Sequence, residues 1–153
     1  MTMIEQRLRE AGFEVPAAQP SVANYVAALV QGDLLFISGQ LPFEAGKVRY
    51  QGRVGDEVSI EDGKLSARLC ALNALGQAKA ALGDLDRIKG CVRIGGFVNS
   101  GAGFHQQPAV VNGASDLIVA ALGDAGRHTR SAVGCSALPM NAATEIEAIF
   151  SIK

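Results

Sequence analysis

The sequence predicts a single α+β domain, in which two helices pack on one face of a mixed β-sheet. The chain has 153 residues, of which 48% are hydrophobic, enough to bury one core without disulfides or a structural metal. Strand-like and helix-like segments follow one another in the order ββαβαββ, without internal repeats or linkers. Because some strands come in runs, this order favours an α+β domain. We therefore treat residues 1–153 as one domain.

Two strands are predicted near the start of this domain, over residues 33–43 and 46–52. The first segment, DLLFISGQLPF, carries β-favouring residues into a Ser-Gly-Gln turn. The second segment, GKVRYQG, has glycine at both ends, which is typical of a short strand between turns. We expect the two segments to pair with each other as a hairpin.

The two helices are predicted over residues 59–83 and 108–126. In both segments apolar residues recur every three or four positions, which is the spacing of one helix face. Ser59 and Asp62 suit a capping pair at the start of the first helix, and Pro108 suits the first turn of the second. The apolar positions are Leu65, Leu69, Leu72, Leu75, Ala78 and Leu82 in the first helix, and Val110, Val111, Ala114, Leu117, Ile118, Ala121 and Leu122 in the second.

The remaining strands are predicted over residues 87–100, 130–137 and 144–152. The first of them, RIKGCVRIGGFVNS, contains glycines at which a bulge can form. The last two are joined by a short segment, LPMNAA, so we expect them to be neighbours in the sheet. The final strand alternates between two faces. One face carries Ile146, Ala148, Phe150 and Ile152, and the other carries Glu145, Glu147, Ile149 and Ser151.

Two helices cannot cover both faces of this sheet. Residues 34–37 are consecutively apolar, so they direct apolar side chains to both faces. An uncovered apolar face of this kind marks an interaction surface. We therefore expect a closed, symmetric oligomer that forms through this face.

The net charge and the lack of long apolar segments exclude several classes of function. Fourteen basic and fifteen acidic residues give a formal net charge of -1, so no overall field attracts nucleic acid or an anionic membrane. No apolar run approaches the length of a bilayer span, and the opening residues, MTMIEQRLRE, lack the pattern of a signal peptide. We expect a soluble, cytoplasmic protein that binds neither nucleic acid nor membranes.

The cysteines and histidines indicate no metal site. Cys70, Cys91 and Cys135 are widely spaced among apolar neighbours, so we expect them to be small core residues rather than ligands. His105 and His128 lack the closely paired partners that zinc requires. No metal is expected.

Arg130 is the residue that most suggests a ligand. The period of two places Ala132 and Gly134 on its face of the strand, and these small side chains leave a pocket with the guanidinium at its edge. A guanidinium forms two parallel hydrogen bonds to a carboxylate, so the pocket suits a planar anion. The alternative is a structural ion pair between Arg130 and Glu145 or Glu147 across the expected hairpin. Spacing alone does not decide between the two.

Three segments together resemble one protein family. The segments YVAALVQGDLLFISGQLPF, TRSAVGCSALP and TEIEAIF are similar to motifs of the RidA/YjgF family, the reactive-intermediate (enamine/imine) deaminases that are also labelled endoribonuclease L-PSP. The resemblance runs from about Tyr25 to Ile152 in the right order. It implies a chorismate-mutase-like fold, assembled as a homotrimer around a barrel of sheets, with pockets between the subunits.

The resemblance also implies a reaction and the residues that carry it. Family members hydrolyse 2-imino acids to 2-keto acids and ammonia without a cofactor. Carried over by motif, Arg130 would hold the substrate carboxylate, and Glu145 would hold or activate the attacking water. The substrate pocket would be completed by Tyr25 from a neighbouring subunit and by Ser38, Gly39, Asn112 and Ala132.

This sequence departs from the family pattern at several positions. Ala132 replaces the cysteine that is usual two residues after the arginine, which enlarges the pocket. His128 stands where a small residue or proline is common. Residues 1–20, which form an N-terminal extension, and the segment YQGRVGDE indicate a longer branch of the family with a different ligand preference.

Three functions follow from these observations. The first is a trimeric imine deaminase, which Arg130, Glu145, Tyr25 and Ser38 favour. The second is a non-catalytic trimer that binds a small carboxylate metabolite and regulates a partner. The third is an RNA-cleaving protein, which we rank last because the chain has no tryptophan and no cluster of Lys and Arg to track phosphates.

Overall fold

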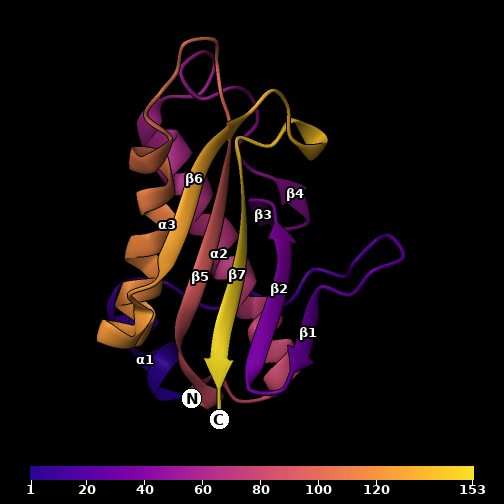
Figure 1. The fold of residues 1–153 in the computed structure, drawn as a ribbon, viewed down its shortest axis with the longest axis vertical. Helices are drawn as coiled ribbons and strands as arrows, with labels where there is room; N and C mark the ends of the chain where they lie inside the picture. The colour runs from indigo at the N-terminus through magenta and orange to yellow at the C-terminus, as the bar shows by residue number, and fades with distance from the viewer.

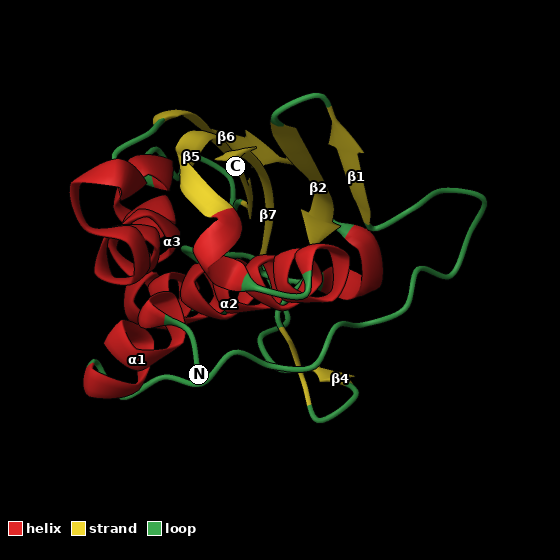
Figure 2. Cartoon of the chain, turned by 90° about the horizontal axis from the view of Figure 1, so that it is seen from below, coloured by secondary structure: helices red, strands yellow, loops and turns green.

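The computed structural model describes residues 1–153 and arranges them in two layers, a twisted sheet and a layer of helices (Figures 1 and 2). The five strands of the sheet lie in the order β1 (Ala28–Gln31), β2 (Leu34–Gln40), β7 (Thr144–Ile152), β5 (Ile88–Asn99) and β6 (Thr129–Cys135). β5 and β6 are parallel, whereas all other neighbours are antiparallel. This mixed sheet with helices on one face confirms the predicted α+β class.

Helix α2 (Ile60–Leu82) has nearly the predicted bounds, because both of its ends are capped as expected. The Ser59 hydroxyl accepts a hydrogen bond from the backbone N–H of Asp62 at 3.1 Å, and Gly83 ends the helix with a φ of 77°. The buried face consists mainly of small residues, which lets the helix lie close to the sheet. Leu65 and Leu69, which we expected on this face, are only half-buried.

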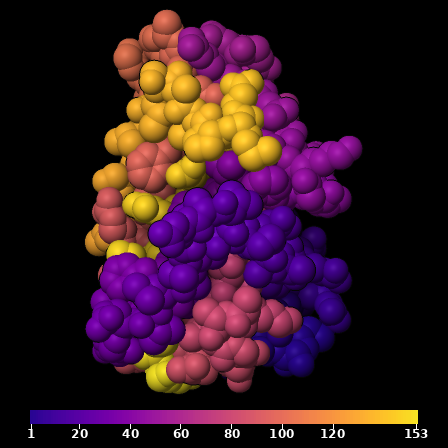
Figure 3. All heavy atoms as spheres, turned by 90° about the vertical axis from the view of Figure 1, so that its right-hand side faces the viewer, coloured from indigo at the N-terminus to yellow at the C-terminus, as the bar shows by residue number.

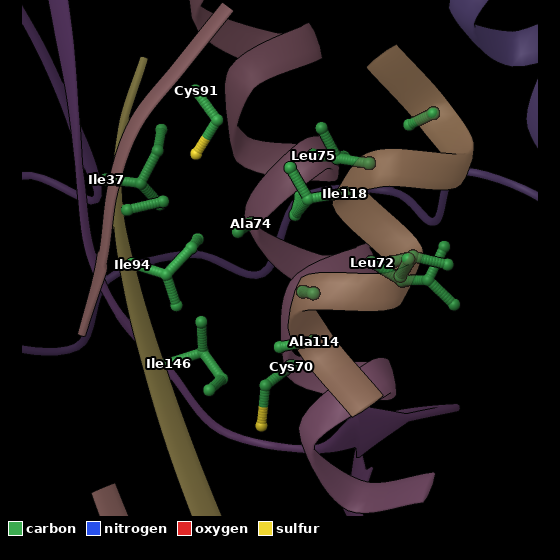
Figure 4. Packing of buried hydrophobic residues seen from close by; sticks show 14 of the residues in the cluster. Ile37, Cys70, Leu72, Ala74, Leu75, Cys91, Ile94, Ala114, Ile118 and Ile146 are labelled. Carbon is green, nitrogen blue, oxygen red and sulfur yellow. The ribbon is translucent and has the colours of Figure 1, made fainter. Parts of the chain in front are cut away.

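Helix α3 (Gln107–Leu122) ends earlier than predicted, and residues Gly123–Gly126 continue as a 3₁₀ turn. All of its predicted apolar positions are buried. α3 packs against α2 and against strands β5 and β6, so the two helices cover one face of the sheet side by side (Figure 2). Figure 4 shows the resulting core, in which Ile37, Ile94 and Ile146 of the strands point toward Leu75 and Ile118 of the helices.

The predicted pairing of residues 33–43 with 46–52 is wrong for most of their length. β2 pairs instead with β1, a strand that we did not predict, and with β7. Only the tips of the two segments form a ribbon, of β3 (Phe43–Glu44) with β4 (Lys47–Val48). The reason is a break in register after Ile37, followed by a proline at position 42 that cannot donate to the ladder.

The expected hairpin of the last two strands is also wrong. β5 lies between β6 and β7, and β6 runs parallel to β5. The connection, residues 136–143, passes over the end of β5, a distance of only about 10 Å for two strand spacings. Asn99 at that end holds the connection, because its side-chain amide donates to the carbonyl of Ala142 at 3.1 Å and its N–H donates to the carbonyl of Ala143.

The first residues fold onto the helix layer as α1 (Met3–Glu10). Thr2 and Glu5 form a capping box at its start, and the carboxylate of Asp86 accepts two further backbone N–H groups there. Glu5 also forms an ion pair with Lys79 of α2. The hydrogen bond from Lys79, together with the capping bonds, lowers the pKa of Glu5 to about 2.

The opposite face of the sheet is uncovered. Leu29 and Phe36 are cross-strand neighbours on it with exposed fractions of 53% and 38%, and Val133 of β6 is 45% exposed. Arg93 and Glu147 lie on the same face. The uncovered apolar face that the sequence predicts is therefore present in the single chain.

The cysteines differ from one another in burial. Cys70 and Cys91 are buried in the core, as expected, and burial raises the pKa of each thiol to about 12. Cys135 is only partly buried at the end of β6, so its placement in the core was wrong. No helix of the chain combines the length and apolarity needed to cross a bilayer.

Candidate functional site

The predicted site residues lie in two separate groups within the protomer. Tyr25, Ser38, Gly39 and Glu145 gather at the end of β2, whereas Arg130, Ala132 and Asn112 belong to β6 and α3. We call these groups the Glu145 half-site and the Arg130 half-site. Each is built by different elements and has a different chemical character.

The Glu145 half-site opens into a cavity of about 490 Å³. Tyr25, Gly39 and Glu145 line this cavity together with Gln77 of α2. The rest of its wall comes from Gln40 at the end of β2, from Phe43 of β3 and from connecting segments, namely Gln19, Pro20, Ser21, Val22, Ala27, Leu41, Pro139 and Met140. Figure 3 shows this side of the molecule, where the yellow connection from β6 to β7 lies above the violet residues that precede and follow β1. A volume of this size suits a small metabolite.

Gly39 allows the Glu145 side chain to lie across the end of β2. A Cβ atom at position 39 would collide with the Glu145 carboxylate, so glycine leaves room for the carboxylate in this position. The hydroxyl of the preceding residue, Ser38, donates to the carbonyl of Val26 at 2.7 Å. Ser38 therefore holds the segment that carries Tyr25 against β2 and does not itself line the cavity.

The environment of Glu145 favours its protonated form. Burial of the side chain is the main cause that raises the pKa of this carboxyl, and the negative charge of Glu147 on the same face adds to the effect. A raised pKa makes the carboxylate a stronger base than that of an ordinary glutamate, and its protonated form can return the proton. Glu145 is therefore suited to proton transfer.

A turn of unusual backbone conformation forms the rim of the same cavity. Met140 and Asn141 have φ values of 57° and 56°, in the left-handed region that residues other than glycine seldom adopt. Gln51 donates to the carbonyl of Met140 and the Gly52 N–H donates to that of Asn141, each at 2.8 Å. The turn thus places Met140 at the cavity, a position that no pattern in the sequence indicates.

Arg130 lies on the other face of the sheet, beside α3. One terminal nitrogen, Nη1, donates to the Ser115 hydroxyl at 3.1 Å, and Nη2 donates to the carbonyl of Pro108 at 3.3 Å. Asn112 comes four residues after Pro108 and three before Ser115, so it shares their side of the helix. Ala132 follows on the same face of β6 and packs against the core. The helical spacing of positions 108, 112 and 115 could have identified Ser115 from the sequence.

The alternative of an ion pair between Arg130 and Glu145 or Glu147 is wrong. Arg130 is opposite Ile94 of β5 in the register, on the helix-covered face, whereas Glu145 is opposite Phe97 on the uncovered face. The ion pairs of the protein are Arg49 with Glu44, Lys64 with Glu61 and Lys79 with Glu5. The hydrogen-bond partners of Arg130 are neutral oxygens, so its positive charge has no carboxylate partner in the protomer.

Comparison with known proteins supports the resemblance on which the site rests. The family described as "YjgF/chorismate mutase-like, putative endoribonuclease" matches residues 5–151. Protein TCP17 of Trypanosoma cruzi is 41% identical over 150 residues, which cover 97% of this chain and 94% of that protein. No group of three or more His, Cys, Asp or Glu side chains in the structure is placed to hold a metal ion.

Solved structures share the fold over nearly the whole chain. Atu1372 of Agrobacterium tumefaciens, whose function is unknown, is 49% identical with a TM-score of 0.92, and the match covers 98% of this chain and 92% of that one. A protein of Shewanella oneidensis MR-1 described as a "putative endoribonuclease" is 35% identical with a TM-score of 0.94, and the match covers 99% of this chain and 100% of that one. TdcF of Escherichia coli, solved with bound serine, is 24% identical with a TM-score of 0.65, covering 89% and 93%, and shares the fold. The chain belongs to the YjgF/RidA family.

Proposed function

We propose that this protein hydrolyses reactive 2-imino acids to 2-keto acids and ammonia in a pocket between the protomers of a homotrimer. One observation carries the proposal. The protomer holds an arginine without a carboxylate partner and a carboxyl group with a raised pKa on opposite faces of its sheet. Neither half-site alone can both bind an anion and move a proton, so a second copy of the chain has to supply the missing half.

The proposed chemistry uses the two half-sites in sequence. Arg130 of one protomer binds the substrate carboxylate through two parallel hydrogen bonds and so fixes the imine carbon. Glu145 of another protomer accepts a proton from a water molecule as its oxygen adds to that carbon. The protonated carboxyl then gives this proton to the nitrogen, which leaves a carbinolamine. Glu145 next takes the hydroxyl proton of the carbinolamine and passes it to the nitrogen as the C–N bond breaks, so ammonia leaves and a 2-keto acid remains.

The remaining predicted residues have supporting roles in this proposal. Tyr25 and Gly39 form the wall next to Glu145, and Ser38 fixes the segment that carries Tyr25. Asn112 lies on the side of α3 that carries Pro108 and Ser115, the partners of Arg130, and we assign it to the polar end of the substrate. The apolar cavity residues, such as Val22 and Met140, are left to contact the substrate side chain. Serine bound to the related TdcF is consistent with a small carboxylate ligand.

A second candidate is a trimer that binds a small carboxylate without turnover. Ala132 favours it, because the family cysteine two residues after the arginine is absent here. Both candidates use Arg130 as the clamp and differ in whether Glu145 moves a proton. Ligand binding without hydrolysis would identify this second function.

The first experiment measures the decay of 2-iminopropionate and 2-iminobutyrate, generated by an amino-acid oxidase and trapped with semicarbazide. We expect the protein to speed the loss of trappable imine, and Arg130→Ala to abolish the effect. Arg127→Ala, which removes an exposed arginine three residues earlier, is the matched control and should stay active. No acceleration by a well-folded oligomer would overturn the deaminase proposal for these substrates.

A second experiment tests whether the pocket joins two protomers. Arg130→Ala and Glu145→Gln chains, each inactive alone, are mixed and reassembled. If each site combines halves from two chains, a 1:1 mixture should recover about one quarter of wild-type activity, because about one site in four receives both intact halves. Recovery of no activity, with mixed oligomers verified by mass spectrometry, would place both halves in one chain.

A further inference from the structure

Arg130 is tethered by a chain of hydrogen bonds that ends at the main chain. Its Nη1 donates to the Ser115 hydroxyl at 3.1 Å, and that hydroxyl lies 2.9 Å from Nε2 of His128. The other ring nitrogen of His128, Nδ1, lies 2.6 Å from the carbonyl oxygen of Gly126. This series of hydrogen bonds thus joins Arg130 to the turn that follows α3.

The partners determine the direction of each hydrogen bond. A carbonyl oxygen only accepts, so Nδ1 of His128 carries a hydrogen and donates to Gly126. In the neutral ring Nε2 is then an acceptor, and the single hydrogen of the Ser115 hydroxyl points to it. The lone pairs of the same oxygen remain free to accept from Arg130. Each donor in this series of hydrogen bonds therefore has one acceptor.

The tether fixes the guanidinium and leaves it able to bind. A second anchor, from Nη2 to the carbonyl of Pro108 at 3.3 Å, acts on the other terminal nitrogen. A guanidinium has five N–H donors, so three remain after these two bonds. Anchors on two different nitrogens oppose rotation of the planar group. An arginine held in this way loses less freedom when a carboxylate binds.

If Arg130 had a purely structural role, we would expect its positive charge to be paired with a carboxylate. Partly buried arginines are commonly paired with a carboxylate, because an unpaired charge is costly to bury. Here every partner of the Arg130 side chain is a neutral oxygen from α3. Hydrogen bonds to neutral groups orient the guanidinium but leave its full positive charge for an anion.

We infer that Ser115 and His128 are positioning residues, which hold the Arg130 guanidinium in the orientation that receives the substrate carboxylate. Ser115 acts directly on the arginine, and His128 acts through Ser115. The inference rests on the proposed function in one respect, namely that Arg130 binds a carboxylate. It adds two residues to the site that touch the arginine or its partner and not the reacting atoms.

The test measures the affinity of the assembled protein for 2-ketobutyrate, by calorimetry, together with kcat and KM for 2-iminobutyrate. Ser115→Ala should raise Kd about tenfold, the loss expected for one hydrogen bond to a charged group, and His128→Leu should approach the same loss because it acts through Ser115. Ser115→Thr keeps the hydroxyl and His128→Gln keeps an acceptor, so both should stay within about threefold of wild type. Asp116→Ala, which changes the next, exposed residue of α3, is the control.

The Arg130→Ala background separates positioning from general damage. If Ser115 and His128 act through the arginine, Ser115→Ala should cause no further loss of affinity when Arg130 is already absent. A further loss of the same size in that background would overturn the inference. So would an unchanged Kd in Ser115→Ala and His128→Leu with only a lower melting temperature, because the network would then simply tie β6 to α3.

A measurement without ligand distinguishes failure of this inference from failure of the proposed function. The side-chain Nε–H signal of Arg130 in NMR spectra should indicate a rigid group in the wild type and a mobile one in Ser115→Ala and His128→Leu. An equally rigid group in these variants would overturn the inference. If Arg130→Ala itself leaves the Kd for 2-ketobutyrate unchanged, the proposed clamp is wrong, whatever the mobility of the arginine.

Discussion

The two half-sites differ in the kind of structure that carries them. The Arg130 half-site lies on a strand and a 16-residue helix, and hydrogen bonds fix its charged group in place. The Glu145 half-site is walled largely by connecting segments, with Gly39 next to a break in strand register and Met140 in a left-handed turn. Regular elements hold a group more precisely than loops do, whereas loops tolerate changes in sequence. In the proposed pocket, Arg130, the proposed anion clamp, would therefore be the rigid half, and the cavity beside Glu145 would be the adaptable half.

The largest effects should come from removing the charged group of each half, and they should differ in kind. Arg130→Ala should raise KM, and Glu145→Gln should lower kcat with a smaller change in KM, each reducing kcat/KM by about 10²- to 10⁴-fold. Steady-state kinetics on 2-iminobutyrate measures the split. Arg127→Ala serves as the control for lost positive charge. Equal effects of both variants on kcat alone would contradict the division into a clamp and a proton-transfer group.

A smaller loss is expected from Gly39→Ala. The added methyl group would collide with the Glu145 carboxylate and displace it, which should lower kcat about 10- to 100-fold. Gly95→Ala is a matched control, because its Cβ would lie 2.6 Å from the carboxylate oxygen of Glu147 instead. Kinetics and thermal unfolding of both variants separate displacement of Glu145 from general strain. Wild-type kcat in Gly39→Ala would show that the position of Glu145 is unimportant.

The pH dependence of kcat should report the protonation of Glu145. Folding raises the pKa of Glu145 above the ordinary 4.5, chiefly by burial, so kcat should rise with pH through an inflection above 4.5 as the carboxylate forms. For the same reason this group stabilises the fold less as pH rises through its raised pKa. Glu147→Gln removes the neighbouring negative charge, so the inflection should move to lower pH. An inflection that is unchanged in Glu145→Gln would assign it to another group.

The smallest effect is expected at the rim of the cavity. Met140→Ala should raise KM about two- to fivefold for imino acids with large apolar side chains and leave 2-iminopropionate unchanged. Met3→Ala is the control, because both methionines are 59% exposed but Met3 lies on α1. The measurement needs 2-imino acids with side chains of increasing size, from the one derived from alanine to the one derived from phenylalanine. A uniform change across the series would exclude Met140 from substrate selection.

The sequence predicts those elements whose signals are local. α2 begins after Ser59 and ends at Gly83 because a capping side chain and a left-handed glycine act on their own neighbours. The partners of β2 and β6 were not predictable in this way. A connection such as residues 136–143 can join adjacent strands or cross one strand, and its length does not distinguish the two.

The candidate site residues, too, could be predicted only where the signal is local. Motifs identify Arg130 and Glu145, but their faces follow from the strand order, which the motifs do not encode. Ser115 and Met140 were missed for different reasons. Ser115 has a helical spacing that points to the arginine, whereas Met140 reaches the cavity through a backbone conformation that depends on Gln51 and Gly52.

The position of β7 has a consequence for how the sheet is completed when the protein folds. β7 follows every other strand in the sequence, yet it lies between β2 and β5 near the middle of the sheet. Without β7 the sheet would be divided into the pair β1–β2 and the pair β5–β6, so its uncovered face would not be continuous. Because Glu145 lies on β7, the strand that makes the uncovered sheet face continuous also carries this carboxyl group. In the proposed oligomer, a chain could therefore assemble only after both Arg130 and Glu145 are in place.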